Sequence, residues 1–264
     1  MKVISIFNQK GGVGKTTTNI NLCSYLAMKG YKILTIDIDP QGNTTSGLGL
    51  DKKNIEASMY DVMTANTSLK DIIKKSEMIE NLFIAPSTIE LAGGEIELID
   101  KKNRETILKD EISKLDNIYD FVFIDCPPSL GLLSVNSLAA SNSVLIPIQA
   151  EFYALEGVGQ LVNTIQLVKK SINKNLYVEG VILTMFDNRT KLSNGVFSEV
   201  NNYFTDKVYT NTIPRNIRLA EAPSFGLPIL LFDDKCKGAE SYSNFSEEFL
   251  SRQKEKVIWL GKVD

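Results

Sequence analysis

The sequence predicts an α/β fold in which a mainly parallel, twisted central sheet is covered by helices on both faces. Short runs of consecutive apolar residues alternate along the chain with longer segments of helical periodicity. Because the runs contain no regular polar alternation, the strands are expected to be buried on both faces, as in parallel sheets. The 264 residues suffice for one large core. We therefore expect a single domain over 1–264, with about 251–264 as a short C-terminal extension.

The apolar runs are the expected strands, and the segments with apolar residues three and four positions apart are the expected helices. Residues 39–50 are polar and rich in glycine, and a loop with three prolines precedes the last helix, so both are expected to be loops. The strands are expected at 3–7, 32–37, 82–85, 121–124 (ending in Asp125), 144–148 and 178–184. The helices are expected around 20–28 and at 57–64, 68–75, 88–98, 102–115, 153–171, 191–204 and 238–256.

A glycine-rich stretch, residues 8–17 (NQKGGVGKTT), joins the first strand to the first helix. This is the context of a phosphate-binding loop, because glycines let backbone N–H groups surround an anion and the helix N-terminus adds partial positive charge. Lys15 is placed to reach the terminal phosphates, and the Thr16 hydroxyl suits Mg²⁺. ATP contacts are expected from Gly11, Gly12, Val13, Gly14, Lys15, Thr16 and Thr17.

One position departs from the usual pattern of such loops, G-x-x-x-x-G-K-[ST]. Gln9 stands where the first glycine is expected, and Lys10 lies just inside the loop. A solvated loop lysine is the plain alternative for Lys10. Two lysines and two threonines in this frame have no packing purpose, so a glycine-rich turn without a ligand is a poor explanation.

Aspartates follow two further strands of the expected sheet. Ligands of parallel sheets bind beyond the carboxyl ends of the strands, so the loops at 8–16, 37–42 and 125–130 are expected to converge. An aspartate near a γ-phosphate can orient the attacking water and hold the Mg²⁺ shell, which suits Asp37 and Asp39. Asp125 follows four apolar residues, the form of a Walker B strand. The predicted metal set is Thr16, Asp37, Asp39 and Asp125.

Composition narrows the class of protein. The net charge of −3 argues against a wholly basic nucleic-acid binder but allows a local basic patch. The sequence contains no histidine, which excludes histidine metal ligands and Ser–His or Cys–His nucleophiles. Three scattered cysteines suit a reducing cytoplasm. No apolar run approaches the roughly 18 residues of a membrane span, and no signal peptide is evident, so a cytoplasmic protein is expected.

The motifs together resemble one known family. The loop K-G-G-x-G-K-T-T resembles the deviant Walker A loop of the family that contains ParA/Soj partition proteins, the division-site regulator MinD and nitrogenase iron protein. IDIDPQGN (36–43) resembles its Walker A′ segment, and DCPPSLGLL (125–133) resembles its switch II. Segments 184–192 (TMFDNRTKL) and 212–228 look specifically like ParA/Soj. The resemblance covers residue 2 to about 250 and implies a single-domain P-loop NTPase.

The resemblance also implies residue roles. Lys10 would cross a dimer interface to the partner's nucleotide, so that it joins Lys15 and Asp39 as a catalytic residue and adds to the ATP-binding set. Asp39 would be tied to hydrolysis and Asp37 would support the metal site. Pro214 and Asn216 would border the adenine. Arg189 and Arg218 would contact DNA phosphates, with possible additions from Lys191, Lys207, Arg215, Lys235 and Lys237.

The function that the resemblance implies is an ATP-dependent DNA-partition ATPase for a chromosome or plasmid. ATP and Mg²⁺ would drive a sandwich homodimer that binds double-stranded DNA non-specifically and is released by hydrolysis. Weak intrinsic hydrolysis would be stimulated by a ParB/Spo0J-like centromere-binding protein. The expected location is the cytoplasm, in association with the nucleoid.

Three alternatives remain open at the sequence level. A MinD-like membrane-associated positioning ATPase would use residues 245–260 as an amphipathic anchor, although Glu247, Glu248 and Glu255 oppose anionic lipid. A redox protein like nitrogenase iron protein needs two cysteines poised for a shared cluster, and Cys126 has no evident partner. A small-molecule kinase or synthetase needs an acceptor site that the sequence does not reveal.

Overall fold

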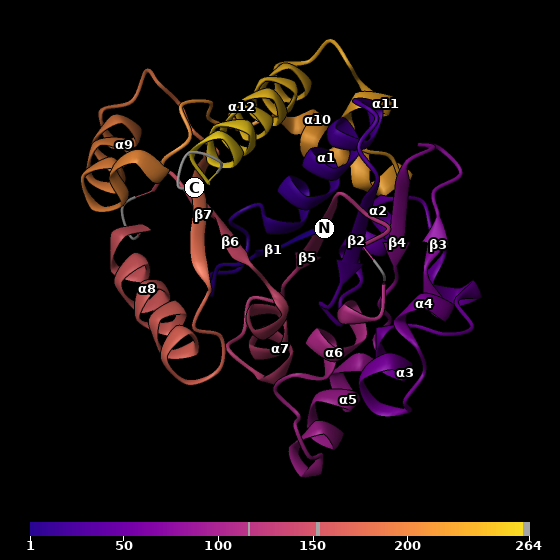
Figure 1. Cartoon of the computed structure of the whole chain (residues 1–264). Coiled ribbons are helices and arrows are strands. Elements are labelled where there is room, and N and C mark those ends of the chain that lie inside the picture. The colour runs from indigo at the N-terminus through magenta and orange to yellow at the C-terminus, as the bar shows by residue number, and fades with distance from the viewer. Residues whose placement is uncertain (116, 152–153, 261–264) are drawn as a thin grey trace.

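A seven-stranded sheet forms the centre of the protein, as the computed structural model of residues 1–115, 117–151 and 154–260 shows (Figure 1). The strand order is β3-β4-β2-β5-β1-β6-β7. All neighbouring strands are parallel except the edge pair β3–β4, which is antiparallel. The predicted fold class is confirmed. The strands are β1 (Lys2–Ile6), β2 (Ile33–Asp37), β3 (Lys74–Lys75), β4 (Leu82–Ala85), β5 (Phe121–Asp125), β6 (Ser143–Gln149) and β7 (Tyr177–Thr184).

Helices cover both faces of this sheet (Figure 1). Four short 3₁₀ segments lie at Lys52–Asn54, Leu98–Asp100, Thr205–Lys207 and Ala222–Phe225. The α-helices are α1 (Lys15–Met28), α2 (Asn43–Gly47), α3 (Met59–Thr64), α4 (Leu69–Ile72), α5 (Leu91–Glu97), α6 (Ile107–Ser113), α7 (Leu132–Ala140), α8 (Ala154–Ser171), α9 (Lys191–Phe204), α10 (Ile217–Glu221), α11 (Ile229–Phe232) and α12 (Lys237–Leu260).

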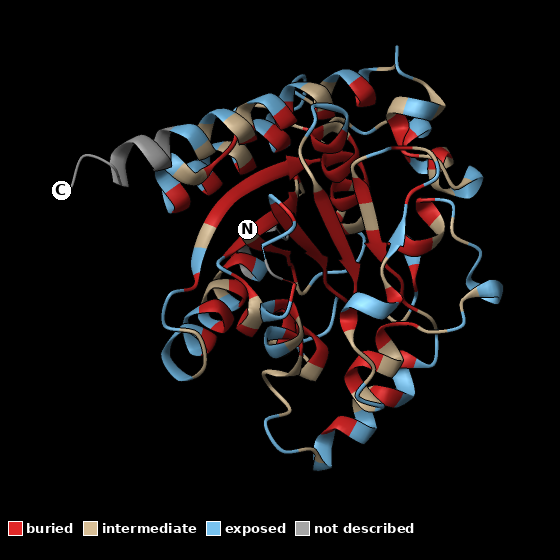
Figure 2. Cartoon of the chain, turned by 45° about the vertical axis from the view of Figure 1, so that its right-hand side comes forward, coloured by how far each residue is buried: buried red, intermediate tan, exposed pale blue. Residues whose placement is uncertain are grey.

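The sheet separates two apolar cores, because successive side chains of a strand point to opposite faces. In β5, Phe121 and Phe123 face the core beneath α1 and α12, whereas Val122 and Ile124 face the core beneath α3 to α9. The central strands are buried along almost their whole length (Figure 2). Their carboxyl ends therefore offer a rigid edge on which loops can be positioned.

The structure differs from the predicted elements in several places. The helix expected at 102–115 begins only at Ile107, because Asn103 adopts a left-handed conformation with φ of 55°. The helix expected at 68–75 ends at Ile72, and the last two residues form the edge strand β3, where lysines suit an exposed edge. α2 lies within the expected loop at 39–50, and α7, α10 and α11 had no predicted counterpart. In α7 the apolar periodicity is obscured by buried polar residues such as Ser137, whose hydroxyl donates to the Leu133 carbonyl at 2.9 Å.

The last helix continues beyond its predicted end. α12 runs without interruption through Leu260, so most of the expected extension at about 251–264 is helix. Residues 261–264 of that extension lie outside the described residues. No helix in the described part of the chain has both the length and the apolar character needed to cross a membrane.

Phe249 packs α12 against the central sheet. It is fully buried, and its ring centroid lies 5.5 Å from that of Phe121 and 5.8 Å from that of Phe123. Phe249→Ala is expected to lower the free energy of unfolding by about 3–5 kcal/mol, because it opens a cavity between helix and sheet. Chemical denaturation measures this, with Leu167→Ala on the exposed face of α8 as the control. Equal losses for the two variants would contradict the packing role of α12.

Candidate nucleotide-binding site

The loop between β1 and α1 has the backbone of a phosphate cradle. Gly12 and Gly14 have φ of 74° and 85°, a left-handed conformation that side-chain-bearing residues rarely adopt. The Thr184 hydroxyl at the end of β7 donates to the Val13 carbonyl at 2.8 Å, and Val13 itself is buried. The loop is therefore anchored to the end of β7, and its glycine backbone stays open on the opposite side.

A cavity of about 340 Å³ lies against this loop and the N-terminus of α1. Lys15 is nearly buried, and its Nζ donates to the Lys10 carbonyl at 3.1 Å. Burial lowers the pKa of the Lys15 ammonium group, against the opposing influence of Asp125. Of the predicted site residues, this cavity brings together Gly11, Gly12, Gly14, Lys15, Thr16, Thr17 and Asp39.

Two buried carboxylates lie beneath the cavity. Asp37 and Asp125 are register partners at the carboxyl ends of β2 and β5, and both are fully buried. Burial raises the pKa of each carboxyl above its usual range, and for Asp37 the negative charge of Asp125 adds to the effect. The Thr44 hydroxyl donates to Oδ2 of Asp125 at 2.7 Å, whereas no described residue hydrogen-bonds to its buried Oδ1.

Asp37 differs from Asp125 because the protein engages both of its oxygens. Its Oδ2 accepts from the backbone N–H of Thr45 at 2.8 Å and from the Thr45 hydroxyl at 2.7 Å. Its Oδ1 accepts from the backbone N–H of Asp39 at 3.3 Å. Asp39 lines the cavity, whereas Asp37 lies behind it.

The chemistry of these groups fits Mg²⁺. Mg²⁺ in nucleotide sites is held by one or two carboxylates together with substrate phosphates and water, not by an all-protein cage. In line with this, the described residues contain no cluster of three or more potential His, Cys, Asp or Glu ligands. The nearby Thr16 hydroxyl opposes the rise in the pKa of Asp125, but Oδ1 of Asp125 is buried and accepts no hydrogen bond of normal geometry from a described residue. Thr16 and Asp39 border the same cavity. Thr16 and Asp125 would hold the ion, and Asp39 lies at the cavity wall beside them.

Lys10 does not line the cavity that the other loop residues share. Its ammonium group forms an ion pair with Glu151, and the residue borders a separate small cavity with Asn8 and Val13. The Asn8 side chain fixes this part of the loop, since it accepts from the Lys10 N–H at 3.0 Å and donates to the Pro147 carbonyl at 2.8 Å. The lysine thus points away from the phosphate cradle of its own subunit.

The far side of the cavity contains residues that the sequence reasoning missed: Gln41, Asn43 and Met185. Met185 follows β7 directly and has a φ of 51°. The rule that ligands bind at strand carboxyl ends, applied to β7 as to the other strands, would have found it. Its neighbour Phe186 forms a parallel bridge with Pro214, the predicted adenine contact, which lines the neighbouring large groove and not this cavity. The Asn216 side chain caps α10 by accepting from the N–H groups of residues 218 and 219.

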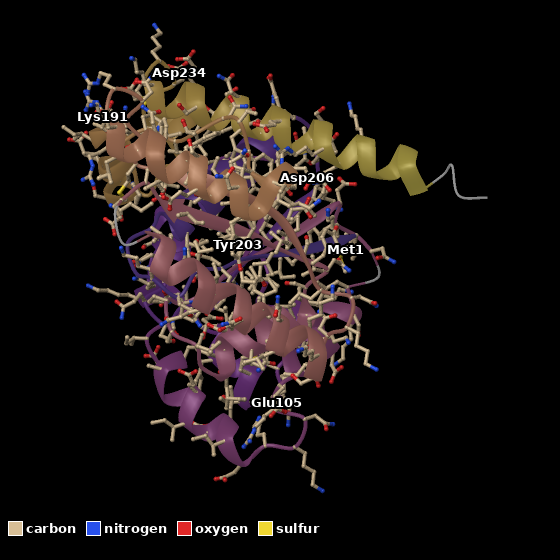
Figure 3. The ribbon with its side chains drawn as sticks, turned by 90° about the vertical axis from the view of Figure 1, so that its left-hand side faces the viewer. Met1, Glu105, Lys191, Tyr203, Asp206 and Asp234 are labelled. Atoms are coloured by element: carbon tan, nitrogen blue, oxygen red, sulfur yellow. The ribbon has the colours of Figure 1, made fainter. Side chains whose placement is uncertain are left out.

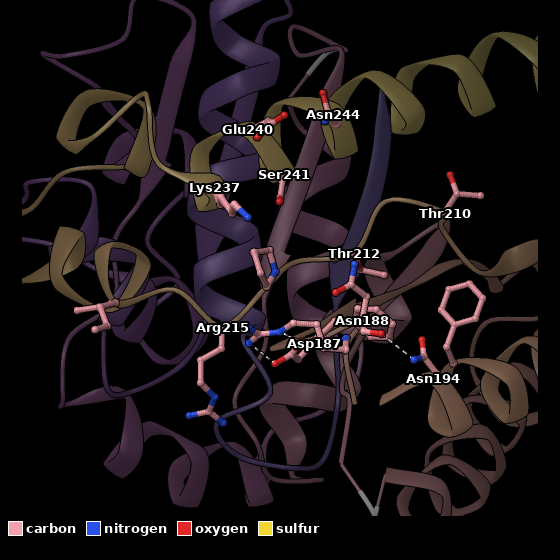
Figure 4. Close-up of a pocket in the computed structure, with 15 residues that line it drawn as sticks. Asp187, Asn188, Asn194, Thr210, Thr212, Arg215, Lys237, Glu240, Ser241 and Asn244 are labelled. Carbon is pink, nitrogen blue, oxygen red and sulfur yellow. Dashed lines mark hydrogen bonds and ion pairs between the residues drawn. The ribbon is translucent and has the colours of Figure 1, made fainter. Parts of the chain in front are cut away.

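A large open groove of about 1090 Å³ lies beside this region, between the loop after β7 and α12 (Figure 4). Its lining includes Arg189, Arg215 and Lys237, together with amide and hydroxyl side chains such as Asn194 and Ser241. Lys191, another residue of the proposed patch, projects from the surface at the start of α9 (Figure 3). The groove therefore combines three cationic side chains with hydrogen-bonding groups and two acidic residues, Asp187 and Glu240.

Both predicted DNA-binding arginines are exposed and paired with carboxylates. Arg189 makes two hydrogen bonds to Asp187, from Nε at 2.9 Å and from Nη2 at 2.8 Å. Arg218 pairs with Glu221 at 3.0 Å and with Asp233 at 3.3 Å. Arg189 lines the groove, whereas Arg218 lies on the neighbouring α10.

Comparison with known proteins finds relatives over nearly the whole chain. The family described as "AAA domain" matches residues 1–178. The sporulation initiation inhibitor protein Soj of Bacillus subtilis is 53% identical over 247 residues, which cover 94% of this chain and 97% of Soj. The chromosome partitioning protein ParA of Myxococcus xanthus is 48% identical over 97% of this chain and 90% of its own length.

A solved structure is similar over nearly the whole fold. The Mycobacterium smegmatis protein described as cobyrinic acid a,c-diamide synthase, with bound ATP analogue and magnesium, matches with a TM-score of 0.83 and 35% identity, covering 96% of each chain. The extent and identity of the sequence matches decide the family. The chain belongs to the Soj/ParA family of chromosome-partitioning ATPases.

Proposed function

We propose that this protein hydrolyses ATP with Mg²⁺ and uses the cycle to switch its affinity for DNA during chromosome or plasmid partition. The observation that carries the nucleotide part is the cavity in which Lys15, Thr16 and Asp39 surround the glycine cradle above the open Oδ1 of Asp125. The similar M. smegmatis structure contains an ATP analogue and magnesium, which supports the same pair of ligands here.

Different residues of the site bind the phosphates and orient the attacking water. The loop N–H groups and the Lys15 ammonium group bind the phosphates and neutralise charge that develops on them. Bound Mg²⁺ would add Lewis-acid stabilisation of the same phosphate oxygens. The Asp39 carboxylate at the cavity wall orients the attacking water. No arginine is among the described residues that line this cavity, in keeping with slow hydrolysis until a partner stimulates it.

The position of Lys10 supports a two-subunit site. Its side chain is turned out of its own cavity and, among the described residues, pairs with Glu151 in a partly exposed ion pair that stabilises it weakly. In an ATP-bound sandwich dimer Lys10 leaves Glu151 and contacts the partner's nucleotide. ATP occupancy is then converted into dimerisation.

The cationic residues in and beside the groove are proposed to bind DNA. Exposed ion pairs contribute little, so Arg189 and Arg218 can exchange their carboxylate partners for DNA phosphates. Dimerisation doubles the number of phosphate contacts, and non-specific affinity rises steeply with that number. A ParB/Spo0J-like protein stimulates hydrolysis and releases the dimer, which otherwise resides on the nucleoid.

Asp39→Ala separates ATP binding from hydrolysis. It is expected to bind ATP normally but to hydrolyse it about a hundredfold more slowly, because the water is no longer oriented. The variant is expected to shift from monomer to dimer on size-exclusion chromatography when ATP and Mg²⁺ are added. Lys15→Ala, which loses the phosphate contact, is the control that stays monomeric. An Asp39→Ala protein that binds ATP and remains monomeric would contradict the sandwich.

Charge reversal in the patch tests DNA binding. Arg189→Glu and Arg218→Glu are each expected to weaken ATP-dependent DNA binding about tenfold or more at low salt, with ATP affinity unchanged. Lys75→Glu is the matched control, because this exposed lysine lies on β3 at the opposite edge of the sheet. A gel shift with random-sequence duplex measures the effect. Equal affinity of all three variants and the wild type would remove the DNA assignment.

A further inference from the structure

The loop that carries Asp39 is fastened to the sheet by two adjacent buried threonines. Thr44 donates to Oδ2 of Asp125 at 2.7 Å and accepts from the Asn19 side-chain amide at 3.0 Å. The same amide donates to the Thr35 hydroxyl at 2.7 Å. Through Thr44, the start of α2 is tied directly to the carboxylate that we assign to the metal.

Thr45 makes the second attachment, with three hydrogen bonds. Its backbone N–H and its hydroxyl both donate to Oδ2 of Asp37, at 2.8 and 2.7 Å. The same hydroxyl accepts from the backbone N–H of Ser87 at 2.9 Å. Thr45 and Asp37 are fully buried, so water does not compete for these bonds.

Asp37 also holds the other end of the same loop. Its Oδ1 accepts from the N–H of Asp39, and the Asp39 carboxylate in turn accepts from the N–H of Gln41 at 2.9 Å. One buried carboxylate therefore fixes residue 39 through one oxygen and residue 45 through the other. Asp39, Gln41 and Asn43, the three residues of this loop that line the nucleotide cavity, all lie within the closed segment.

We propose that Asp37 and Thr45 form a clamp that positions Asp39, and that Asp37 acts as the anchor of this clamp and not as a group of the metal site. The inference rests on the proposed ATPase function and names the positioning residues of that site. It follows from the occupation of both Asp37 oxygens, in contrast to the open Oδ1 of Asp125. The metal would then depend on Thr16 and Asp125, and the clamp would act on the water-orienting Asp39.

The clamp predicts distinct effects for three substitutions. Thr45→Val keeps the shape of the side chain but leaves the Ser87 N–H unpaired and removes a bond to Asp37, so the loop loosens. Thr45→Ser keeps the hydroxyl and is the matched control. Asp37→Asn places an amide N–H against one of the two backbone N–H groups, at residue 39 or 45, and releases that end of the loop.

The experiment compares these full-length variants with the wild type in two ways. Steady-state hydrolysis gives kcat, the KM for ATP and the Mg²⁺ concentration for half-maximal rate. Hydrogen–deuterium exchange of segment 39–47 without nucleotide reports the clamp independently of activity. Thermal unfolding confirms that each variant is folded.

The clamp predicts that Thr45→Val and Asp37→Asn lower kcat about tenfold, since a small displacement of a reacting group is costly. Both are expected to leave the Mg²⁺ half-saturation within about twofold of wild type and to speed exchange in 39–47, and Thr45→Ser is expected to restore both readouts. A several-fold rise in Mg²⁺ half-saturation for Asp37→Asn, with normal exchange in Thr45→Val, would overturn the clamp. A wild-type protein without ATP hydrolysis would instead refute the proposed function, and the exchange measurement would still decide on the clamp.

Discussion

The constraint on which the site depends is the burial of two carboxylates side by side at the carboxyl ends of β2 and β5. Asp37 and Asp125 are paired in register, so their separation is fixed by the sheet itself. Buried carboxylates are costly unless hydrogen bonds or cations compensate them. The protein compensates them with Thr44, Thr45 and the nearby Lys15. The same hydrogen bonds hold α2 and the Asp39 loop against the carboxyl ends of β2 and β5.

Hydrogen bonds engage both oxygens of Asp37 but, at normal geometry, only one oxygen of Asp125. Oδ1 of Asp125 is buried without a described hydrogen-bond partner, so in the proposed cycle the site would gain stability from a cation that arrives with the nucleotide. Lys10 has a comparable position, since it belongs to the phosphate loop and yet pairs with Glu151 outside the cradle. In the proposed cycle, Oδ1 of Asp125 becomes linked to the metal and Lys10 contacts the nucleotide of a second subunit. Both features connect ATP binding to a change of state.

The fold and the cradle were predictable from sequence because their signals are local. Unbroken apolar runs such as the one ending in Asp125 specify buried parallel strands, and the glycine spacing around Lys15 specifies the loop. Met185 was missed although it directly follows β7, because ligand-binding loops were expected only after β1, β2 and β5. The hydrogen bonds of Asp37 were equally hidden, since they come from Thr45 in a segment that resembled an irregular loop. Hydrogen bonds from residue 45, eight positions along the chain, separate the surroundings of Asp37 from those of Asp39, and residue type alone does not reveal them.

The most direct test is a crystal structure of Asp39→Ala with ATP and Mg²⁺. We predict that ATP lies in the cradle of Lys15 and that the metal is bound at Thr16 and linked to Asp125. Asp37 is expected to remain hydrogen-bonded to Thr45. Lys10 of each subunit is expected at the nucleotide of the other. A structure in which Asp37 has released Thr45 and binds the metal, or in which Lys10 stays paired with Glu151 in an ATP-bound dimer, would contradict this account.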